Sequence, residues 1–440
     1  MPTMTRYRRR WAALAVLLTA EAMNLLDATI VQVAGPVIHA DLAGPAAGIP
    51  WFSAAYTLPF AVFLITGGRL GDLFGRAKVF KIGVAGFVLA SLACAAAPNA
   101  GLLIGARAVQ GTAAALIIPQ TIGLIRALFD GDERAKALGA IGPVMGLSAV
   151  TGPLLGGLLT QAVSWRAVFL VNVPLGLAVL LAARLLREDR AATRPRLDPV
   201  GTVLVVAGTG LLVYPLITPE GTSWALLAAG AALLVVFGFQ QRRASAPLVE
   251  PSLFADRGFP AALAGSLLFF AVMTGLMQVV PMRLQLGLGV DVRTAGLTLL
   301  PLSAGLAVSS WFAGTRLVPK FGARVMFAGL ALVLTGILAI VGGVLPLPGA
   351  LALCGLGMGT FTVPFFTAAL HRVRPPETGS AAGLLNAVQQ LGGTLGVALL
   401  GGLYLSTGTA TAALGVAAGL TVAAAVAVTP MLAAAKATLS

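Results

Sequence analysis

Charged residues are scarce in this sequence. Lys, Arg, Asp and Glu make up 10% of its 440 residues, whereas a soluble domain carries about 25%. Cysteine and histidine are rarer still, with two of each, and no cluster of Cys, His and acidic residues forms around His39 or His371. These shortages exclude a soluble enzyme, and they leave no pattern for a disulfide framework, a metal site or nucleophilic catalysis.

Two further features of partner-binding proteins are missing. No glycine-rich phosphate loop ending in Lys-Ser or Lys-Thr is present, so the sequence offers no ATP site. The net charge is +14, but the basic residues are scattered between apolar runs instead of clustering on one element, as a nucleic-acid partner would require. We therefore expect no nucleic-acid partner and no cofactor.

Apolar residues are abundant, at 58% of the chain, and are accompanied by 54 glycines. One bilayer crossing takes about 20 mainly apolar residues, so fourteen crossings take about 280. The apolar runs between Gly, Pro and charged breaks predict an all-α membrane protein with fourteen helices, at 11–35, 51–71, 79–97, 101–125, 137–160, 166–186, 198–217, 222–240, 260–282, 294–316, 323–345, 348–370, 379–404 and 409–433. Cys94 and Cys354 fall inside such runs and are expected to be buried.

The distribution of basic residues tests this helix count. The first apolar run follows Arg6, Arg8, Arg9 and Arg10 and is too long for a secretory signal, so we interpret it as an uncleaved helix. With the N-terminus inside, 25 Lys and Arg residues lie at the cytoplasmic ends and only Arg166, Arg283 and Arg293 lie outside. One span more or fewer would reverse every later loop. The pattern therefore predicts a multi-pass protein with both termini cytoplasmic.

An internal echo predicts a duplicated architecture. The segment Gly68–Arg76, after the second predicted helix, recurs loosely as Thr315–Ala323 after the tenth, where the acidic residue is absent. We therefore expect two pseudo-symmetric six-helix bundles, at 1–187 and 258–440, with two inserted helices at 188–257. Repeated bundles are typical of secondary transporters.

Six motifs resemble those of one transporter family. Along the chain they are Leu26–Pro36, Gly68–Lys78, the set Leu103, Arg107, Gln110 and Gly111, the set Gly142 and Gly152–Gly157, Ser164–Gly176, and Asn386–Gly393. In this order they resemble the major facilitator superfamily, and within it the 14-helix drug/proton antiporters, over essentially the whole chain. Gln32, Gly35 and Ala77 depart from the usual motif residues.

The resemblance implies a function as well as a fold. Members of this family are monomeric secondary transporters that export bulky lipophilic or cationic small molecules, such as drugs and antibiotics, in exchange for protons by alternating access. An Arg-rich, Lys-poor balance suggests a GC-rich bacterial source, and the expected location of such a transporter is the bacterial inner (plasma) membrane. The nearest alternative is the same fold transporting a lipid, siderophore or metabolite, and a more distant one is a polytopic membrane enzyme.

Asp27 is the expected proton carrier. An ionised carboxylate inside a bilayer span costs roughly 2.5 to 3.5 kcal/mol, so burial favours its neutral form and gives it a reason to exchange protons. Arg107 is the basic residue nearest the middle of a predicted span and is the expected counter-ion. The alternatives are that Asp27 pairs with Arg107 for packing alone, or that Arg107 only pins its helix to a backbone carbonyl.

Glu21 is the other acidic residue deep in a predicted span. It lies about 9 Å along the helix and 120° around it from Asp27, so the two do not share a face. A second proton site and a contact for cationic substrates are both open for Glu21. A protonated carboxyl facing a cavity or the lipid edge is the alternative.

Two glycine-rich segments are expected to control opening and closing. In the first, Gly68, Asp72, Gly75 and Arg76 suggest a cytoplasmic latch in which Asp72 faces a helix N-terminus of the other bundle. The alternative is a solvated loop whose charges set topology. In the second, Gly152, Pro153, Gly156 and Gly157 leave one face of the fifth helix nearly free of side chains, which favours close packing, and the resemblance implies that this face seals the bundles.

Substrate contacts are expected at aromatic, Met and amide side chains near the middle of the spans, since a bulky ligand needs an adaptable lining with a few polar anchors. For any single position, packing or lipid contact is the alternative. The candidates are Asn24, Tyr56, Phe60, Gln110, Met273, Met277, Gln278, Phe361, Phe365, Asn386 and Gln389.

Overall fold

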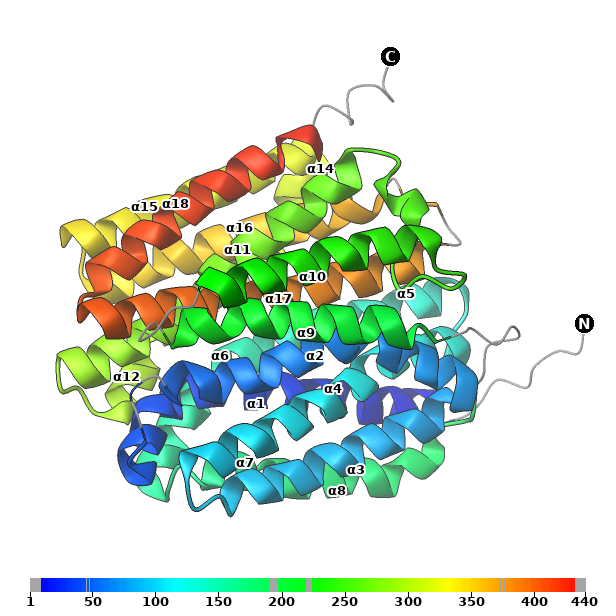
Figure 1. Ribbon diagram of the computed structural model, residues 1–440, viewed down its shortest axis with the longest axis horizontal. Coiled ribbons are helices and arrows are strands. Elements are labelled where there is room, and N and C mark those ends of the chain that lie inside the picture. Colours follow the sequence, from blue (N-terminus) through cyan, green and yellow to red (C-terminus); the bar gives the residue numbers. More distant parts are fainter. Residues whose placement is uncertain are drawn as a thin grey trace, which may run out of the picture.

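A computed structural model describes residues 9–44, 46, 48–189, 197–218, 224–371, 373–374 and 377–431, and among these residues there is no β-strand. Long helices run side by side through the whole molecule (Figure 1). This arrangement confirms the expected all-α class. It also satisfies the backbone hydrogen bonds within each helix, as a lipid environment requires.

The first half of the chain contains six crossings. Two of them are interrupted helices, since α5 continues into α6 and α7 continues through α8 into the 3₁₀ turn η1. The elements are α1 (Arg10–Leu42), α2 (Gly48–Phe74), α3 (Arg76–Ala95), α4 (Ala100–Leu128), α5 (Gly131–Gly139), α6 (Ile141–Ala162), α7 (Ala167–Leu170), α8 (Asn172–Ala182) and η1 (Ala183–Leu185).

The second half begins after an inserted pair of helices. The pair is α9 (Pro199–Ile217) and α10 (Trp224–Arg243), followed by the short 3₁₀ turn η2 (Pro251–Phe254). The later elements are α11 (Gly258–Met282), η3 (Arg283–Gly287), α12 (Val292–Thr298), α13 (Leu300–Phe312), η4 (Ala313–Leu317), α14 (Val318–Phe321), η5 (Gly322–Arg324), α15 (Val325–Gly342), α16 (Leu347–His371), α17 (Thr378–Thr407) and α18 (Ala410–Ala427).

Thirteen helical stretches within the described residues are long and apolar enough to cross a membrane, and one of them makes two crossings. This stretch, Val292–Gly342, has 51 residues. As a straight helix it would measure about 76 Å, against about 30 Å of hydrocarbon. Gly322 interrupts it with a φ of 60°. Thirteen stretches therefore give fourteen crossings, as the sequence predicts.

Packing against α16 shows that the chain folds back at Gly322. A Cβ added to Gly305 of α13 would lie 2.9 Å from the carbonyl oxygen of Ala352, and one on Gly329 of α15 would lie 2.7 Å from that of Gly357. Two glycines on opposite sides of Gly322 therefore contact neighbouring turns of the same helix. This is possible only if α13 and α15 lie alongside α16 in opposite directions.

The expected internal echo is visible in the backbone. Gly75 and Gly322 occupy equivalent places in the two copies and have φ of 106° and 60°, which a side chain would strain. At Gly75 space is also restricted, because an added Cβ would lie 2.5 Å from Oε1 of Glu188. Both copies therefore use glycine to turn the chain between two crossings.

Each half has its own apolar core. One large cluster comes from α11–α18, with Val33 and Ile49 as its members from the first half. Two other clusters come from α1–α8, with Ala387 as a contribution from α17. Few core residues are shared, so the two halves are separate packing units that meet along an interface.

The inserted pair is attached to both halves. Asp198 caps α9 by accepting from the Gly201 backbone N–H at 2.8 Å, and it holds α10 by accepting from Gln241 at 2.7 Å. A Cβ on Gly402 of α17 would lie 2.3 Å from the carbonyl oxygen of Leu216. On the α2 side, Arg69 donates to the Ala246 carbonyl at 3.1 Å.

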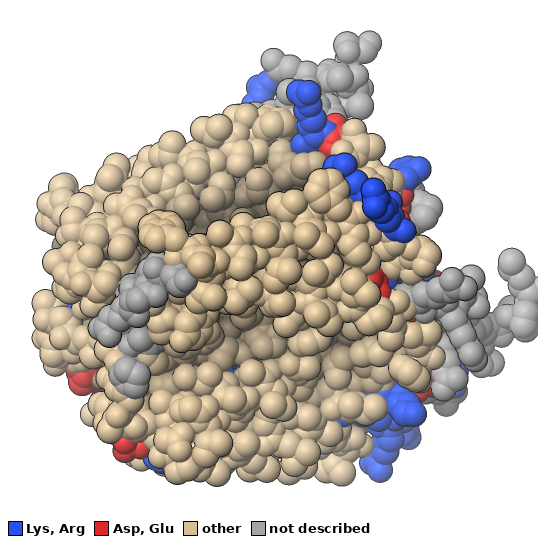
Figure 2. Space-filling view, viewed as in Figure 1, with Lys and Arg blue, Asp and Glu red and all other residues tan. Residues whose placement is uncertain are grey.

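Charged residues gather at one end of the molecule, and a broad uncharged band separates them from a few charges at the other end (Figure 2). The basic end carries the C-terminus of α10 and the turns after α2 and α14, with Arg243, Lys78 and Lys320. The opposite end carries Asp41, Arg166 and Asp291. The uncharged band is the surface that a membrane would cover.

One expected boundary was wrong. We expected the first helix to end near Gly35, yet α1 continues to Leu42 with Pro36 inside it. Proline removes one backbone donor but does not have to end a transmembrane helix, because neighbouring groups satisfy the freed carbonyl. The longer helix carries Asp41 to the opposite end, where it accepts from Trp165 at 2.8 Å.

Candidate functional site

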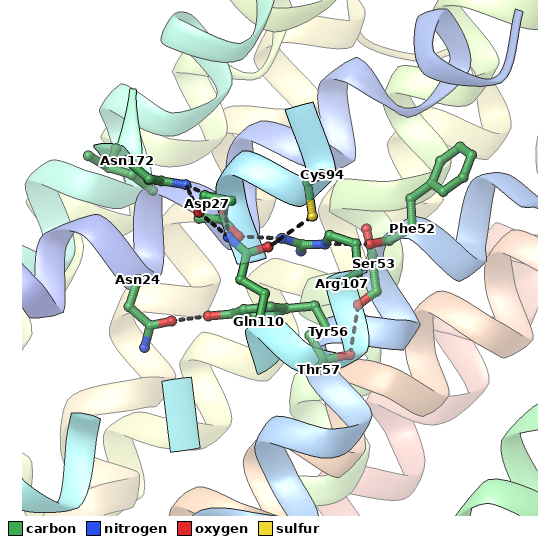
Figure 3. Close-up of polar contacts among 12 residues, drawn as sticks. Asn24, Asp27, Phe52, Ser53, Tyr56, Thr57, Cys94, Arg107, Gln110 and Asn172 are labelled. Atoms are coloured by element: carbon green, nitrogen blue, oxygen red, sulfur yellow. Dashed lines mark hydrogen bonds and ion pairs between the residues drawn. The ribbon is translucent and has the colours of Figure 1, made fainter. Parts of the chain in front are cut away.

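The two charged residues expected inside the spans lie together. Asp27 of α1 and Arg107 of α4 are both 0% exposed. Arg107 donates through a terminal guanidinium nitrogen to Oδ2 of Asp27, forming a buried ion pair (Figure 3). An unpaired charge at this depth would be strongly destabilising, and the pairing offsets part of the cost of burying both partners.

Neutral side chains complete the environment of Asp27. Its Oδ1 accepts from Gln110 at 2.9 Å and from Asn172 of α8 at 2.7 Å. The same two amides donate to the hydroxyl oxygen of Ser91, at 2.8 and 3.3 Å. Three donors from two helices therefore hold the ionised carboxylate (Figure 3).

Arg107 also binds α2. Its Nε donates to the carbonyl oxygen of Phe52 at 2.9 Å, and its guanidinium lies 4.3 Å from the centre of the Tyr56 ring. A terminal nitrogen donates to Oε1 of Gln110 at 2.7 Å. Arg107 therefore makes the contacts of both sequence interpretations, since it pairs with Asp27 and also bonds a backbone carbonyl of the neighbouring helix.

A glycine allows α4 to approach α2 this closely. A Cβ on Gly111 would lie 2.0 Å from the carbonyl oxygen of Tyr56, closer than any real contact. Gly111 follows Gln110 directly, so the backbones touch one residue away from the polar network. Close packing of α4 on α2 therefore requires the glycine of the fourth-helix motif. This close approach brings the Arg107 side chain within hydrogen-bond distance of α2.

Glu21 lies outside this network. It is 8% exposed, and its Oε2 has no hydrogen-bond partner among the residues that the structure describes. Asn24, one turn further along α1, accepts a hydrogen bond from the Tyr56 hydroxyl. Asn24 therefore has a protein partner, whereas one oxygen of Glu21 remains without one.

Sequence reasoning missed several members of the network. Asn172 and Ser91 were not singled out, although Asn172 lies in the Ser164–Gly176 motif, and an amide in an apolar run is an available signal. Gln110 was expected to contact substrate, but it is fully buried against Asp27. That expectation is corrected by the geometry, since all of its polar atoms bind protein groups.

A cavity of about 330 Å³ opens between α2, α4 and α17 at the basic end. Asn386 is the residue from our substrate set that lines it, together with Gly68, Asp72 and Arg76 from the loop motif. Gln120, Arg69 and Arg126 add polar groups to the wall. The size lies at the lower end of the range for small-molecule sites.

Other expected substrate contacts are packing residues in this structure. Phe361 stacks on Phe269 at 4.0 Å and on Phe365 at 5.0 Å, within the apolar core of the second half. Aromatic rings stabilise a core as readily as a ligand site, so their position along the helix did not distinguish the two. Four more of the expected substrate contacts are buried inside the protein and do not line the cavity, namely Tyr56, Phe60, Met277 and Gln278. Two partly exposed candidates, Met273 and Gln389, do not line the cavity either.

The loop motif makes a different contact from the one expected. Asp72 accepts from Arg76 of its own loop at 2.8 and 3.0 Å, instead of facing a helix N-terminus of the other half. Arg76 also donates to Asp189 at 2.7 Å, and the Ala77 backbone N–H donates to Glu188 at 3.0 Å. Charge attraction within the loop therefore holds Asp72, and the chain after η1 supplies the acidic partners.

The glycine face of α6 is tight at one end and open at the other. A Cβ on Gly156 would lie 2.9 Å from the carbonyl oxygen of Ile30, and one on Gly157 would lie 2.9 Å from that of Val292 in the second half. The Gly152 position would meet Thr29 of α1. Towards the basic end, a Cβ on Gly142 would meet nothing within 4 Å.

The helices that pack on α6 from the second half, α12 and α13, also lie close to it at one end and further from it at the other. Gly296 of α12 packs on Pro153, since an added Cβ would lie 2.5 Å from the Pro153 carbonyl oxygen. Further along, the nearest neighbour of a Cβ on Gly146 is Ala307 of α13, at 4.0 Å. The two halves are therefore closed at the opposite end and separated towards the basic end.

Among the described residues there is no group of three or more His, Cys, Asp or Glu that could hold a metal ion.

The chain is similar to bacterial transport and resistance proteins over most of its length. It is 43% identical over 422 residues to the "Probable actinorhodin transporter" of Streptomyces coelicolor, covering 90% of this chain and 73% of that protein. The "Puromycin resistance protein pur8" of Streptomyces alboniger is 39% identical over 92% of this chain and 83% of its own length. The "Multidrug resistance protein Stp" of Mycobacterium tuberculosis is 35% identical over 86% and 73%.

Family and fold comparisons agree with these relatives. A solved crystal structure of a peptide transporter, POT, superposes with a TM-score of 0.67 over 95% of this chain and 94% of that chain, at 14% identity, which is a likeness of fold. The sequence pattern of the Major Facilitator Superfamily matches residues 17–397. The chain therefore belongs to the major facilitator superfamily, a family of multi-pass membrane transporters.

Proposed function

We propose that this protein is a proton-driven exporter of bulky lipophilic small molecules, of the antibiotic and drug class, in a bacterial plasma membrane. The observation that carries the proposal is the buried pair of Asp27 and Arg107 inside a crossing of a superfamily transporter. Relatives named for the transport of, or resistance to, actinorhodin, puromycin and multiple drugs support the substrate class.

Proton exchange at Asp27 gives the mechanism its driving force. In the ionised state the carboxylate binds Arg107, Gln110 and Asn172. A proton on Asp27 removes the charge that holds Arg107, so the network has two arrangements that differ by one proton. Each proton that enters down a 100 mV potential supplies about 2.3 kcal/mol, so no ATP is required.

We assign the basic end to the cytoplasm, because short loops rich in Lys and Arg remain on that side. Both termini are then cytoplasmic. The cavity beside Asn386 opens inward, and the contact between Gly157 and Val292 closes the outward side. Asp27 is fully buried in this arrangement. Proton uptake from outside therefore requires the opposite end of the halves to open.

Glu21 is proposed as a second proton site or as a contact for a cationic substrate. Its Oε2 has no hydrogen-bond partner among the described residues, and an ionised, unpaired carboxylate is costly inside a bilayer. A proton or a cationic group satisfies that oxygen. The variant Glu21→Gln separates these roles, since a change limited to cationic substrates indicates contact, whereas a change for all substrates indicates proton transfer.

The function is tested with purified protein in proteoliposomes. A panel of lipophilic and cationic dyes and antibiotics is added under an imposed proton gradient, and the internal pH and substrate content are followed. We expect substrate accumulation on the side from which protons leave, together with dissipation of the gradient. Accumulation of a lipid, siderophore or metabolite alone would favour the alternative substrate class, and turnover of a lipid would indicate an enzyme.

A further inference from the structure

One turn of α2 contacts both the proton site and the second half of the protein. On one face, the Phe52 carbonyl accepts from Arg107 at 2.9 Å and the Tyr56 ring lies under its guanidinium. On a second face, the hydroxyls of Ser53 and Thr57 contact Gln278 and Thr394 of the second half. Residues four apart share a helix face. Phe52 and Tyr56 therefore face Arg107, whereas Ser53 and Thr57 face the second half.

The structure assigns to Thr57 and its partner Thr394 a positioning role, in which their hydroxyl pair couples the charge state of Asp27 to the closed outward end. This inference rests on the proposed proton exchange at Asp27. It concerns residues outside the acid network itself, and it identifies how a change at Arg107 reaches the second half.

The contact between the halves is a chain of hydroxyl groups. Thr394 of α17 and Thr57 of α2 lie 2.7 Å apart through their hydroxyl oxygens. The outer acceptors are the Ser53 carbonyl, 3.2 Å from the Thr57 hydroxyl, and the Gln390 carbonyl, 2.9 Å from the Thr394 hydroxyl. Two hydroxyl protons serve three contacts, so the bond between the hydroxyls forms when one threonine donates to the other instead of to the carbonyl of its own helix.

A second contact lies one turn away and follows the same interface. The Ser53 hydroxyl lies 3.5 Å from Oε1 of Gln278 in α11, and both side chains are buried. Beyond it, a Cβ on Gly401 of α17 would lie 3.1 Å from Pro50. This part of the interface is tight, so separating the halves here breaks the bond between the Thr57 and Thr394 hydroxyls and the contact of Ser53 with Gln278, which resists opening.

The coupling follows from geometry. While Asp27 is ionised, it fixes Arg107, and Arg107 fixes the turn through Phe52 and Tyr56. When Asp27 takes a proton, Arg107 loses its ionic partner and the turn is released from that side. The turn then moves away from Thr394 more easily. An empty, ionised transporter therefore stays closed to the outside, which prevents futile opening.

Distance measurements between spin labels test the inference in the full-length protein in lipid nanodiscs. Val163→Cys and Leu288→Cys place labels at the opposite end, one on each half, at side chains that are 74% and 62% exposed. The native Cys94 and Cys354 are buried and give an unlabelled background. The measured quantity is the ratio of long to short distances from pH 5 to pH 8.

We expect Thr57→Val and Thr394→Val each to raise the open-to-closed ratio about fivefold at neutral pH, the effect of losing one ordinary hydrogen bond. The double variant gives the same ratio as either single one, because the contact is shared. The pH dependence of the ratio is smaller in the double variant, because opening then depends less on the charge of Asp27. Thr394→Ser keeps a hydroxyl and restores the wild-type ratio.

Thr421→Val is the matched control. Thr421 is buried in α18 and donates to the Ala417 carbonyl of its own helix at 2.8 Å, so this hydrogen bond does not cross between the halves. We expect an unchanged ratio. The titratable groups around Asp27 are Arg107, Tyr56 and Cys94, with Glu21 on the same helix, so Glu21→Gln identifies any pH response that belongs to Glu21.

The inference is overturned if Thr394→Val leaves the ratio unchanged, or if its effect adds in full to that of Asp27→Asn. Full additivity would mean that the hydroxyl pair and the acid act independently. The proposed function fails in a different way, namely through proton-coupled transport that survives Asp27→Asn in proteoliposomes. The distance ratios do not depend on that transport assay, so the two failures are distinguishable.

Discussion

At the scale of single residues, the charged members of the site could be identified from the sequence, whereas its neutral members could not. A charged group inside a bilayer span needs a partner or a function, so Asp27 and Arg107 could be identified without coordinates. Asn172 and Ser91 carry no such cost and resemble many other polar residues in helices. Their roles depend on the distance between α3, α8 and α1, which local sequence does not determine.

Replacing Arg107 with Lys tests whether the guanidinium shape matters beyond its charge. Arg107 binds Asp27 and Gln110 through one terminal nitrogen and the Phe52 carbonyl through Nε, and it stacks on Tyr56, so a single ammonium group cannot reproduce this geometry. We expect Arg107→Lys to reduce coupled transport by about tenfold or more, as for the loss of one charge-assisted hydrogen bond. Wild-type transport rates in this variant would show that charge alone suffices.

Asn172 tests the neutral part of the network. Its amide donates to Asp27 at 2.7 Å. Asn172→Ala removes a hydrogen bond to a charged group, which is worth about 1.5 to 3 kcal/mol. We therefore expect roughly a tenfold fall in substrate-driven proton movement, measured in proteoliposomes at matched protein content. Unchanged coupling would remove Asn172 from the mechanism.

At the scale of helices, the sequence predicted where the crossings lie better than what their faces contact. Apolar length and loop charge predict fourteen crossings. The end of α1 was missed because Pro36 was taken as a break. Phe361 and Phe365 were assigned to substrate because an aromatic stripe looks the same in sequence whether it faces a cavity or a core. Only the packing of α11 against α16 decides this.

Two glycines of α4 form a matched pair for testing helix packing. A Cβ on Gly111 would lie 2.0 Å from the Tyr56 carbonyl oxygen, whereas one on Gly105 would meet nothing within 4 Å. We expect Gly111→Ala to lower the thermal unfolding midpoint in detergent by several degrees, because α4 must move away from α2. Gly105→Ala should be neutral or slightly stabilising, since Ala favours the helix. Equal midpoints for both variants would contradict the packing described for α2 and α4.

At the scale of the whole molecule, two halves with separate cores meet tightly at the opposite end and diverge towards the basic end. Repetition of the loop motif led us to expect two halves, and the resemblance of the motifs predicted the transporter family. Neither feature specifies which end is open, because the sequence of an alternating transporter must be compatible with both arrangements. Only the structure shows which end of the two halves is open.

Chemical labelling tests the cavity and its orientation together. Asn386 lines the cavity at the basic end, whereas Gln278 is buried at the interface of the halves. We expect Asn386→Cys to react with a membrane-impermeant thiol reagent in inside-out vesicles and not in intact cells, and Gln278→Cys to react slowly in both. Reaction of Asn386→Cys from the outside of intact cells would reverse the assigned orientation.

The most direct measurement of the central claim is substrate-driven proton movement in proteoliposomes that contain wild-type protein or Asp27→Asn. Asparagine keeps the size and hydrogen-bonding shape of the side chain but cannot carry a proton. Asp132→Asn, the same change at an exposed residue of α5, serves as the control and should behave as wild type. We predict that Asp27→Asn abolishes the proton movement while the protein remains folded. Normal proton movement in Asp27→Asn would contradict the account.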